Sequence, residues 1–227
     1  MRIIELEEVD STNEYCKRQN FADDVAVVAR CQTAGRGTKG RSFVSDYGGL
    51  YITVVRHYKD CLTQNAFQIM INSCVAVCKT LEKFSIKPNI RWANDVLVDG
   101  KKICGTLIEN TFGGNKILRS IVGMGINVNN EIPCDLKDIA TSITQHVSTK
   151  VTVDEVKVAL LKNLENNYSV CDYKSYINYF GKTAILKTED GERQVKVLDI
   201  SDDGRLIVKE TDGAVNKISS AEVSLRL

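Results

Sequence analysis

The stretch IRWANDVLVDGKKICGTLIENTFGGNKILRSIVGMGINV, residues 90–128, indicates the fold class of this chain. Three runs of β character follow one another in it, at residues 90–98, 102–110 and 116–128. The turn signals Asp99-Gly100 and Gly113-Gly114-Asn115 separate these runs, and turns of this kind join neighbouring strands into hairpins. The stretch therefore predicts a meander of three successive strands.

Segments on either side of the meander add helices and further strands. Residues 66–81 place apolar side chains at helical spacing, which predicts a long amphipathic helix. A second helix is expected where apolar residues recur every four positions, at Val156, Leu160, Leu164 and Tyr168. Strands are also expected at residues 3–9, 25–29 and 51–55. Ser11 and Glu14 form a capping-box pattern, which predicts the start of a short helix after the first strand.

The last part of the chain has a different residue pattern, with short β-like pieces separated by turns. After Gly181, short β-like pieces are expected at residues 183–187, 193–200, 206–209 and 215–218. Turns that contain Asp-Gly separate them, at residues 189–191, 202–204 and 211–213. Such even spacing predicts a small β-barrel. The expected fold is α+β, with a mixed sheet and flanking helices in residues 1–178 and the barrel in residues 179–227.

Composition excludes several classes of protein. The 227 residues are 43% hydrophobic and 26% charged with a net charge of +1, so no global field would attract nucleic acid or a membrane. The eight cysteines include no C-x-x-C pair, which favours reduced thiols over a zinc site or a disulfide framework. The chain shows neither a signal peptide nor an apolar run of membrane-spanning length. We expect a cytoplasmic protein that binds neither nucleic acid nor a membrane.

A long cationic loop, CQTAGRGTKGRSF at residues 31–43, is the first candidate for function. Its glycines let backbone N–H groups approach a ligand, and Arg36, Lys39 and Arg41 add donors that suit phosphate oxygens. It is not a Walker A loop, because no Gly-Lys-Ser/Thr closes it, and no helix plainly follows it as in a Rossmann fingerprint. Taken alone, the loop is equally well explained as a solvated surface segment.

Two further segments combine glycines with chemically active side chains. In the run Arg91-Trp92-Ala93-Asn94-Asp95, the aspartate could accept a proton from an attacking amine, and Lys102 across a hairpin could stabilise negative charge. A salt-bridged hairpin is the plainer alternative. Gly123 and Gly125 forgo side-chain packing on an apolar strand, which indicates a close ligand, a close backbone or a bulge. Asn127 could read a base edge through its amide.

Together these segments resemble the biotin protein ligases. The matching motifs are Asp10-Ser11-Thr12-Asn13, Gly35-Arg36-Gly37, Trp92-x-Asn94-Asp95, Lys102-x-x-Gly105 and Gly123-x-Gly125-Ile126-Asn127-Val128-Asn129, in that family's order and spacing. The resemblance covers essentially the whole chain, including a C-terminal segment similar to the family's SH3-like domain. It implies a catalytic domain related to class II aminoacyl-tRNA synthetases. The implied reaction activates biotin with MgATP as biotinyl-5′-AMP and passes the biotinyl group to one lysine of a biotin carboxyl carrier domain.

The resemblance also implies roles for individual residues. The implied catalytic residues are Lys102, which would hold the biotin carboxylate and the α-phosphate, Arg36 on the loop, and Asn94 and Asp95 near the attacking lysine. The implied biotin-binding residues are Ser11, Thr12, Asn13, Gln32, Gly35, Arg36, Phe43, Lys102, Gly105, Gly123 and Gly125. The implied ATP- or adenylate-binding residues are Arg36, Lys39, Arg41, Trp92, Asn94, Lys102 and Asn127. No protein-only metal site is implied, since Mg²⁺ would arrive with ATP.

The chain departs from the usual family pattern at four positions. Thr38 stands where many members carry a second arginine, so retention of the adenylate is expected to be looser or to depend on Lys39. Phe43 replaces a frequent tryptophan, and Arg91 and Ala93 alter the usual Lys-Trp-Pro-Asn-Asp run without removing a catalytic group. The first strand begins near the N-terminus, which leaves no room for the winged-helix domain of some members. We therefore expect a ligase without DNA binding, and a homodimer is compatible with the resemblance.

Other functions compete with this interpretation. A lipoate ligase or octanoyltransferase shares the fold, but Ser11, Thr12, Asn13 and Gln32 on the ureido side, together with the barrel, favour biotin. A non-catalytic regulator that binds biotin or the adenylate would be expected to lose Lys102 or Asp95, and both are present. A pure interaction module would not explain three separate glycine-marked segments.

Overall fold

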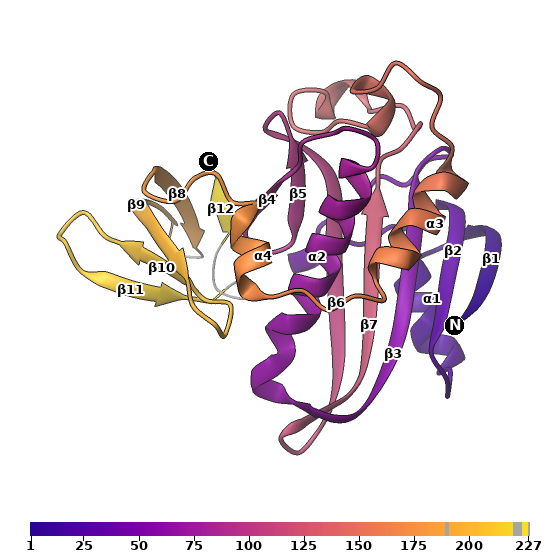
Figure 1. Cartoon of the computed structure of the whole chain (residues 1–227), viewed down its shortest axis with the longest axis horizontal. Helices are drawn as coiled ribbons and strands as arrows, with labels where there is room; N and C mark the ends of the chain where they lie inside the picture. Colours follow the sequence, from indigo (N-terminus) through magenta and orange to yellow (C-terminus); the bar gives the residue numbers. More distant parts are fainter. Residues whose placement is uncertain (189–190, 220–223, 227) are drawn as a thin grey trace.

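The computed structural model describes residues 1–188, 191–219 and 224–226. They form a seven-stranded sheet of order β1-β2-β3-β7-β6-β5-β4 and a five-stranded sheet of order β11-β10-β9-β8-β12 (Figure 1). The strands of the larger sheet are β1 (Arg2–Val9), β2 (Val25–Gln32), β3 (Leu50–Leu62), β4 (Asn89–Arg91), β5 (Asp95–Val98), β6 (Lys101–Gly113) and β7 (Lys116–Ile126). The predicted mixed sheet is confirmed, since β1 and β2 pair in parallel and the other neighbours pair antiparallel.

The predicted meander forms one side of this sheet, from β7 in the middle to the edge strand β4. Asp99 and Gly100 both have positive φ, 49° and 79°, as a tight turn between β5 and β6 requires. The second turn joins β6 to β7, and β7 then pairs with β3 along most of its length. Because β3 comes from before the meander in the sequence, this pairing brings the N-terminal segments beside residues 101–126.

Helices cover both faces of the larger sheet. Helix α1 (Thr12–Gln19) lies over one face, where Val25, Val27, Val55 and Ile121 form a small buried cluster with Cys16. The longer helices α2 (Ala66–Glu82) and α3 (Val153–Asn163) cover the opposite face and its main core (Figure 1). Neighbouring residues of one strand contribute to different cores because successive side chains point to opposite faces.

Three local predictions were wrong. Residues 90–98 are not one strand, since Trp92-Ala93-Asn94 turns the chain so that Arg91 pairs with Asp95. The second helix ends at Asn163, and a short helix α4 (Val170–Ser175) with its own capping box at Ser169 follows. Ser11 precedes α1 but makes no side-chain cap, and the capping box does not form: Ser11 N–H donates to Asp10 Oδ1, and Glu14 pairs with Lys17 and Arg36.

The smaller sheet confirms the predicted barrel-like segment. Its strands are β8 (Thr183–Thr188), β9 (Gly191–Ile200), β10 (Leu206–Lys209), β11 (Val215–Ile218) and β12 (Ser224–Arg226), of which β12 was not predicted. All its strand pairs are antiparallel. The predicted turn residues Glu189 and Asp190 lie outside the described residues.

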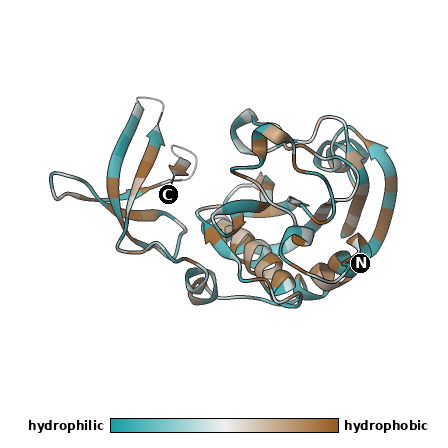
Figure 2. Cartoon of the chain, turned by 90° about the horizontal axis from the view of Figure 1, so that it is seen from above, coloured by the Kyte–Doolittle hydropathy of each residue, from teal (hydrophilic) through white to brown (hydrophobic). Residues whose placement is uncertain are grey.

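The smaller sheet packs against the meander end of the larger one, away from β1 (Figure 2). The Trp92 indole N–H donates to the Gly204 carbonyl at 2.9 Å, and Lys174 pairs with Asp199 at 2.8 Å. Gly204 lies so close to the Phe67 ring that an added methyl group would overlap it. These contacts join the smaller sheet to the run that contains Asn94 and Asp95. Among the helices of the described ranges, none has the length and hydropathy needed to cross a bilayer.

Candidate active site

Two adjoining cavities lie where the loop at residues 33–49 covers the sheet. The first cavity is bordered by the start of α1, the end of β2 and the middle of β6 and β7. The predicted residues that line it are Ser11, Thr12, Asn13, Gln32, Arg36, Phe43, Asn94, Lys102, Gly105, Gly123 and Gly125. The second cavity, of ≈ 380 Å³, includes Lys39, Arg41, Trp92, Asp95 and Lys187. Phe43, Asn94 and Lys102 border both, so the cavities meet at these side chains.

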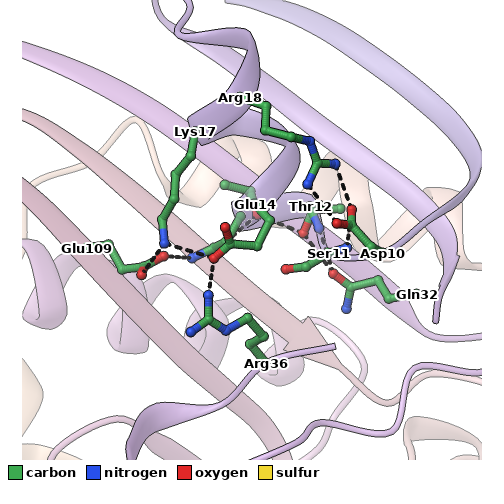
Figure 3. Close-up of polar contacts among 11 residues, drawn as sticks. Asp10, Ser11, Thr12, Glu14, Lys17, Arg18, Gln32, Arg36 and Glu109 are labelled. Atoms are coloured by element: carbon green, nitrogen blue, oxygen red, sulfur yellow. Dashed lines mark hydrogen bonds and ion pairs between the residues drawn. The ribbon is translucent and has the colours of Figure 1, made fainter. Parts of the chain in front are cut away.

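Hydroxyl and amide groups form the floor of the first cavity. The Gln32 side-chain oxygen accepts from the Thr12 backbone N–H at 2.8 Å, and its amide nitrogen donates to Ser45 Oγ at 2.8 Å (Figure 3). Thr53 Oγ1 lies 2.8 Å from Thr12 Oγ1 and 2.7 Å from Asn13 Oδ1. This floor can both donate and accept hydrogen bonds. Thr53, buried beneath this floor, was not predicted, although the one threonine in the apolar first half of β3 was the signal for it.

The three predicted glycines make room for other side chains of the site. The side chains beside them are Lys102 at Gly105, Asn13 at Gly123 and Phe43 at Gly125. An added Cβ would lie 2.8 Å from Lys102 Nζ at Gly105, and 2.7 Å from the Phe43 ring at Gly125. The glycines thus act through their neighbours, which the sequence could not show.

Phe43 and Lys102 nearly fill the first cavity. Lys102 Nζ lies 5.7 Å from the centroid of the Phe43 ring, whose edge faces Tyr51. The open volume of ≈ 40 Å³ is far below the roughly 300–1,000 Å³ of typical ligand sites. An organic ligand could enter only if these two side chains moved aside.

The glycine-rich loop is folded back on itself. Gly37 N–H donates to the Arg41 carbonyl at 2.7 Å, and Phe43 N–H donates to the Gly35 carbonyl at 2.8 Å. Arg36 borders the first cavity and pairs with Glu14 of α1 (Figure 3). The predicted residue Gly35 lies behind the cavities, where its Cα faces Phe43 O and Ser45 Oγ.

An ion cluster stands at the junction of the cavities. Asp95 lies between Lys102 Nζ and Arg91 Nη2, each 2.7 Å from one carboxylate oxygen. Burial alone would raise the pKa of Asp95, but Lys102 and Arg91 overcome that effect and hold the pKa below its ordinary value. The Lys102 contact is an ion pair without hydrogen-bond alignment, so Oδ1 of Asp95 has no aligned donor among the described residues. Lys102 can therefore leave Asp95 without breaking a well-formed hydrogen bond.

The backbone of Lys102 is held on both sides. Its N–H donates to the Ile139 carbonyl at 2.8 Å, and its carbonyl accepts from Thr141 N–H at 2.9 Å. Asn127 Nδ2 donates to the Thr141 carbonyl at 3.0 Å, and Asn127 Oδ1 accepts from Asn130. Asn127 lines neither cavity, so the structure does not bring this predicted adenylate residue to the rest of the site.

Two other predicted residues have their polar atoms engaged within the protein. Trp92 borders the second cavity, but it is only 4% exposed and its indole N–H is bonded to Gly204. Asn94 Nδ2 donates to the Thr106 carbonyl at 2.9 Å. Within the described ranges, no three His, Cys, Asp or Glu side chains converge to hold a metal ion.

Lys187 was missed by the sequence analysis. It lies on β8 of the smaller sheet and borders the second cavity, and its Nζ pairs with Glu192 at 2.5 Å. No motif surrounds it in the sequence. Only the packing of the two sheets shows that this lysine adds a cation beside Lys39 and Arg41.

Comparisons with known proteins agree with this geometry. The model of the biotin/lipoate A/B protein ligase family matches residues 6–127, and that of the biotin protein ligase C-terminal domain matches residues 179–226. The bifunctional ligase/repressor BirA of Bacillus subtilis is 32% identical over 237 residues, covering 97% of this chain and 72% of that protein. A biotin–[acetyl-CoA-carboxylase] ligase of Paracoccus denitrificans is 32% identical over 129 residues, covering 54% of this chain and 53% of that protein. The solved structure of a biotin protein ligase from Aquifex aeolicus in complex with biotin and ATP has a TM-score of 0.83 and 31% identity, covering 99% of this chain and 98% of that one.

Proposed function

Because this chain belongs to the biotin protein ligase family, we propose that it activates biotin with ATP and transfers the biotinyl group to a lysine of a carrier protein. The intermediate is biotinyl-5′-AMP. One observation carries the proposal: a cavity with a polar floor and a cation-lined cavity meet where Lys102 borders both, beside Phe43 and Asn94. Two anionic substrates that must react end to end need this arrangement.

The first cavity suits biotin. A ureido ring presents two N–H donors and one carbonyl acceptor, and the floor formed by Ser11, Thr12, Asn13 and Gln32 carries hydroxyl and amide groups of both kinds. The dithiolane ring of lipoate has neither N–H donors nor a carbonyl, so it would form no such hydrogen bonds with this floor. The polar floor therefore favours biotin over lipoate.

The second cavity suits the nucleotide. Lys39, Arg41 and Lys187 supply positive charge for the phosphates, and Trp92 forms part of the wall. Mg²⁺ bound with ATP would offset part of the triphosphate charge, and Asp95 is the carboxylate at this cavity that could support it. Asn127 stands behind Lys102 and supports it through Thr141.

Lys102 acts in adenylation, and Asp95 acts in the transfer to the acceptor lysine. For adenylation, Lys102 turns from Asp95 towards the biotin carboxylate and the α-phosphate and offsets their repulsion. Asp95 then keeps only Arg91, so its pKa rises because burial opposes its charge. For transfer, the amine of the acceptor lysine attacks the biotinyl carbonyl, AMP leaves, and Asp95 accepts the proton of the amine.

Several wider assignments belong to the same proposal. The boundary between catalytic and C-terminal domains lies between residues 178 and 179, supported by the C-terminal match at 179–226 and by the start of β8 at Thr183. The acceptor is a biotin carboxyl carrier domain. A homodimer would pair through the larger sheet, of which β1 is an edge strand. Localisation in the cytoplasm stays a prediction from cysteine spacing.

The proposal is tested with purified protein, Mg²⁺, ATP and radiolabelled biotin. We expect pyrophosphate release that depends on biotin, followed by label on an added carrier-domain fragment. Lipoate in place of biotin should give neither. Calorimetry that detects no binding of biotin by the folded protein, with or without ATP, would overturn the assignment.

A further inference from the structure

A continuous chain of polar contacts runs from the floor of the first cavity to the glycine-rich loop. Asn13 Nδ2 donates to Glu109 Oε2 at 3.0 Å, and Lys17 Nζ lies 2.6 Å from Glu109 Oε1. Lys17 Nζ also lies 2.8 Å from Glu14 Oε1, and the same oxygen of Glu14 pairs with Nη1 of Arg36 (Figure 3). Glu14 is the residue through which α1 contacts the loop arginine.

Helix geometry places Glu14 in this chain. Glu14 and Lys17 are three residues apart on α1, so their side chains lie on one face of the helix. The Lys17 ammonium lowers the pKa of Glu14 more than partial burial raises it, and Arg36 lowers it further. Glu14 is thus a carboxylate at neutral pH. Its side chain is 27% exposed, and it takes no part in capping α1.

Arg36 keeps hydrogen-bonding capacity after it pairs with Glu14. A guanidinium carries five N–H donors in a rigid plane, and the contact with Glu14 engages Nη1. Arg36 itself borders the first cavity, whereas Glu14 does not. The contact therefore holds Arg36 at Nη1 beside the cavity and leaves the other guanidinium nitrogens for an anion.

Building on the proposed function, we propose that Glu14 is a positioning residue, which docks the glycine-rich loop through Arg36 and thereby retains the adenylate intermediate. Glu14 does not touch the substrates. Its effect passes through the orientation of Arg36, and Lys17, itself paired with Glu109, holds the Glu14 carboxylate in place. Because Thr38 adds no charge to the loop, retention of the adenylate depends more strongly on the docking of Arg36.

A neighbouring ion pair on the same helix offers a matched control. Arg18 pairs with both carboxylate oxygens of Asp10, at 2.6 and 2.7 Å (Figure 3). This pair is more exposed than that of Glu14, and Arg18 lines neither cavity. Arg18→Gln removes a charge from α1 without touching the loop.

The first experiment needs no ligand. Limited trypsin digestion cuts after Arg36, Lys39 and Arg41, and it reports how firmly the loop is docked. We expect Glu14→Gln to speed cleavage within residues 36–41 by about two- to fivefold, the range for a partly exposed ion pair, and Glu14→Asp to restore part of the protection. Arg18→Gln should match the wild type. Equal cleavage rates for wild type and Glu14→Gln would overturn the proposal.

The second experiment links docking to retention. With biotin, MgATP and no acceptor, Glu14→Gln should release free biotinyl-5′-AMP about two- to fivefold faster than wild type. In an Arg36→Gln background the same change should add nothing, since its effect passes through Arg36. Full additivity of the two substitutions would refute the positioning role. Failure of the wild type to form any adenylate would instead refute the proposed function, and the digestion result would still decide the docking.

Discussion

Replacing Lys102 with methionine would test the junction of the two cavities directly. Methionine keeps an unbranched side chain of similar length beside Phe43 and Gly105, but it removes the ammonium group that lies 2.7 Å from Asp95. Adenylation then lacks the cation that offsets the carboxylate and the α-phosphate. We expect kcat for biotin-dependent pyrophosphate release to fall by roughly 10²–10³-fold, the usual loss when one such donor is removed.

The same substitution should also destabilise the fold. Removing one partner from a fully buried ion pair costs about 3–5 kcal/mol. Here the Lys102 side chain is 30% exposed, and Arg91 still neutralises Asp95, so we expect a free energy of unfolding lower by about 1–2 kcal/mol.

Lys101→Met is the matched control. The neighbouring lysine donates only to the Lys137 carbonyl among its described contacts and lines neither cavity. Pyrophosphate release and urea denaturation should be measured for both variants and for wild type. If Lys102→Met turned over like Lys101→Met while still folded, Lys102 would not be the group that joins the two substrates.

Three further predictions concern neighbouring groups. Asp95→Asn should slow transfer to the carrier more than adenylation, since only transfer needs the proton acceptor; equal losses in separate half-reaction assays would contradict this. The pKa of Asp95 is lower in the folded protein than in the unfolded chain, so its carboxylate stabilises the fold above the unfolded pKa. This stabilisation is lost as the pH falls through the folded pKa. In denaturation measured at several pH values, the free energy of unfolding of Asp95→Asn should therefore fall less steeply with acid than that of wild type. Gly125→Ala places a methyl group 2.7 Å from the Phe43 ring. The KM for biotin should rise about tenfold, which corresponds to roughly 1.4 kcal/mol of overpacking. An unchanged KM would show that the ring moves freely. Lys187→Met should raise the KM for ATP severalfold and leave the KM for biotin unchanged. A change in the KM for biotin alone would contradict the assignment of Lys187 to the nucleotide cavity.

Much of the fold followed from local signals. The turn at Asp99-Gly100 and the runs of β character around it predicted the meander, because turn chemistry and strand propensity are properties of adjacent residues. The strand predicted at residues 3–9 ends where β1 ends, but the strand predicted at residues 25–29 was too short, since β2 continues to Gln32. The break at Trp92 could not be read in the same way, since its indole is held by Gly204 from the other sheet.

The sequence by itself determined the element types, the family and most residues that border the two cavities, because each of these is carried by short motifs with their own chemistry. Only the tertiary structure showed that Thr53 supports the polar floor through Thr12, that Glu14 pairs with Arg36, and that Lys187 borders the second cavity. Each of these residues acts on a partner far away in the chain. Such contacts arise from strand pairing and sheet packing, which bring distant segments together without leaving a periodic or local mark on the sequence.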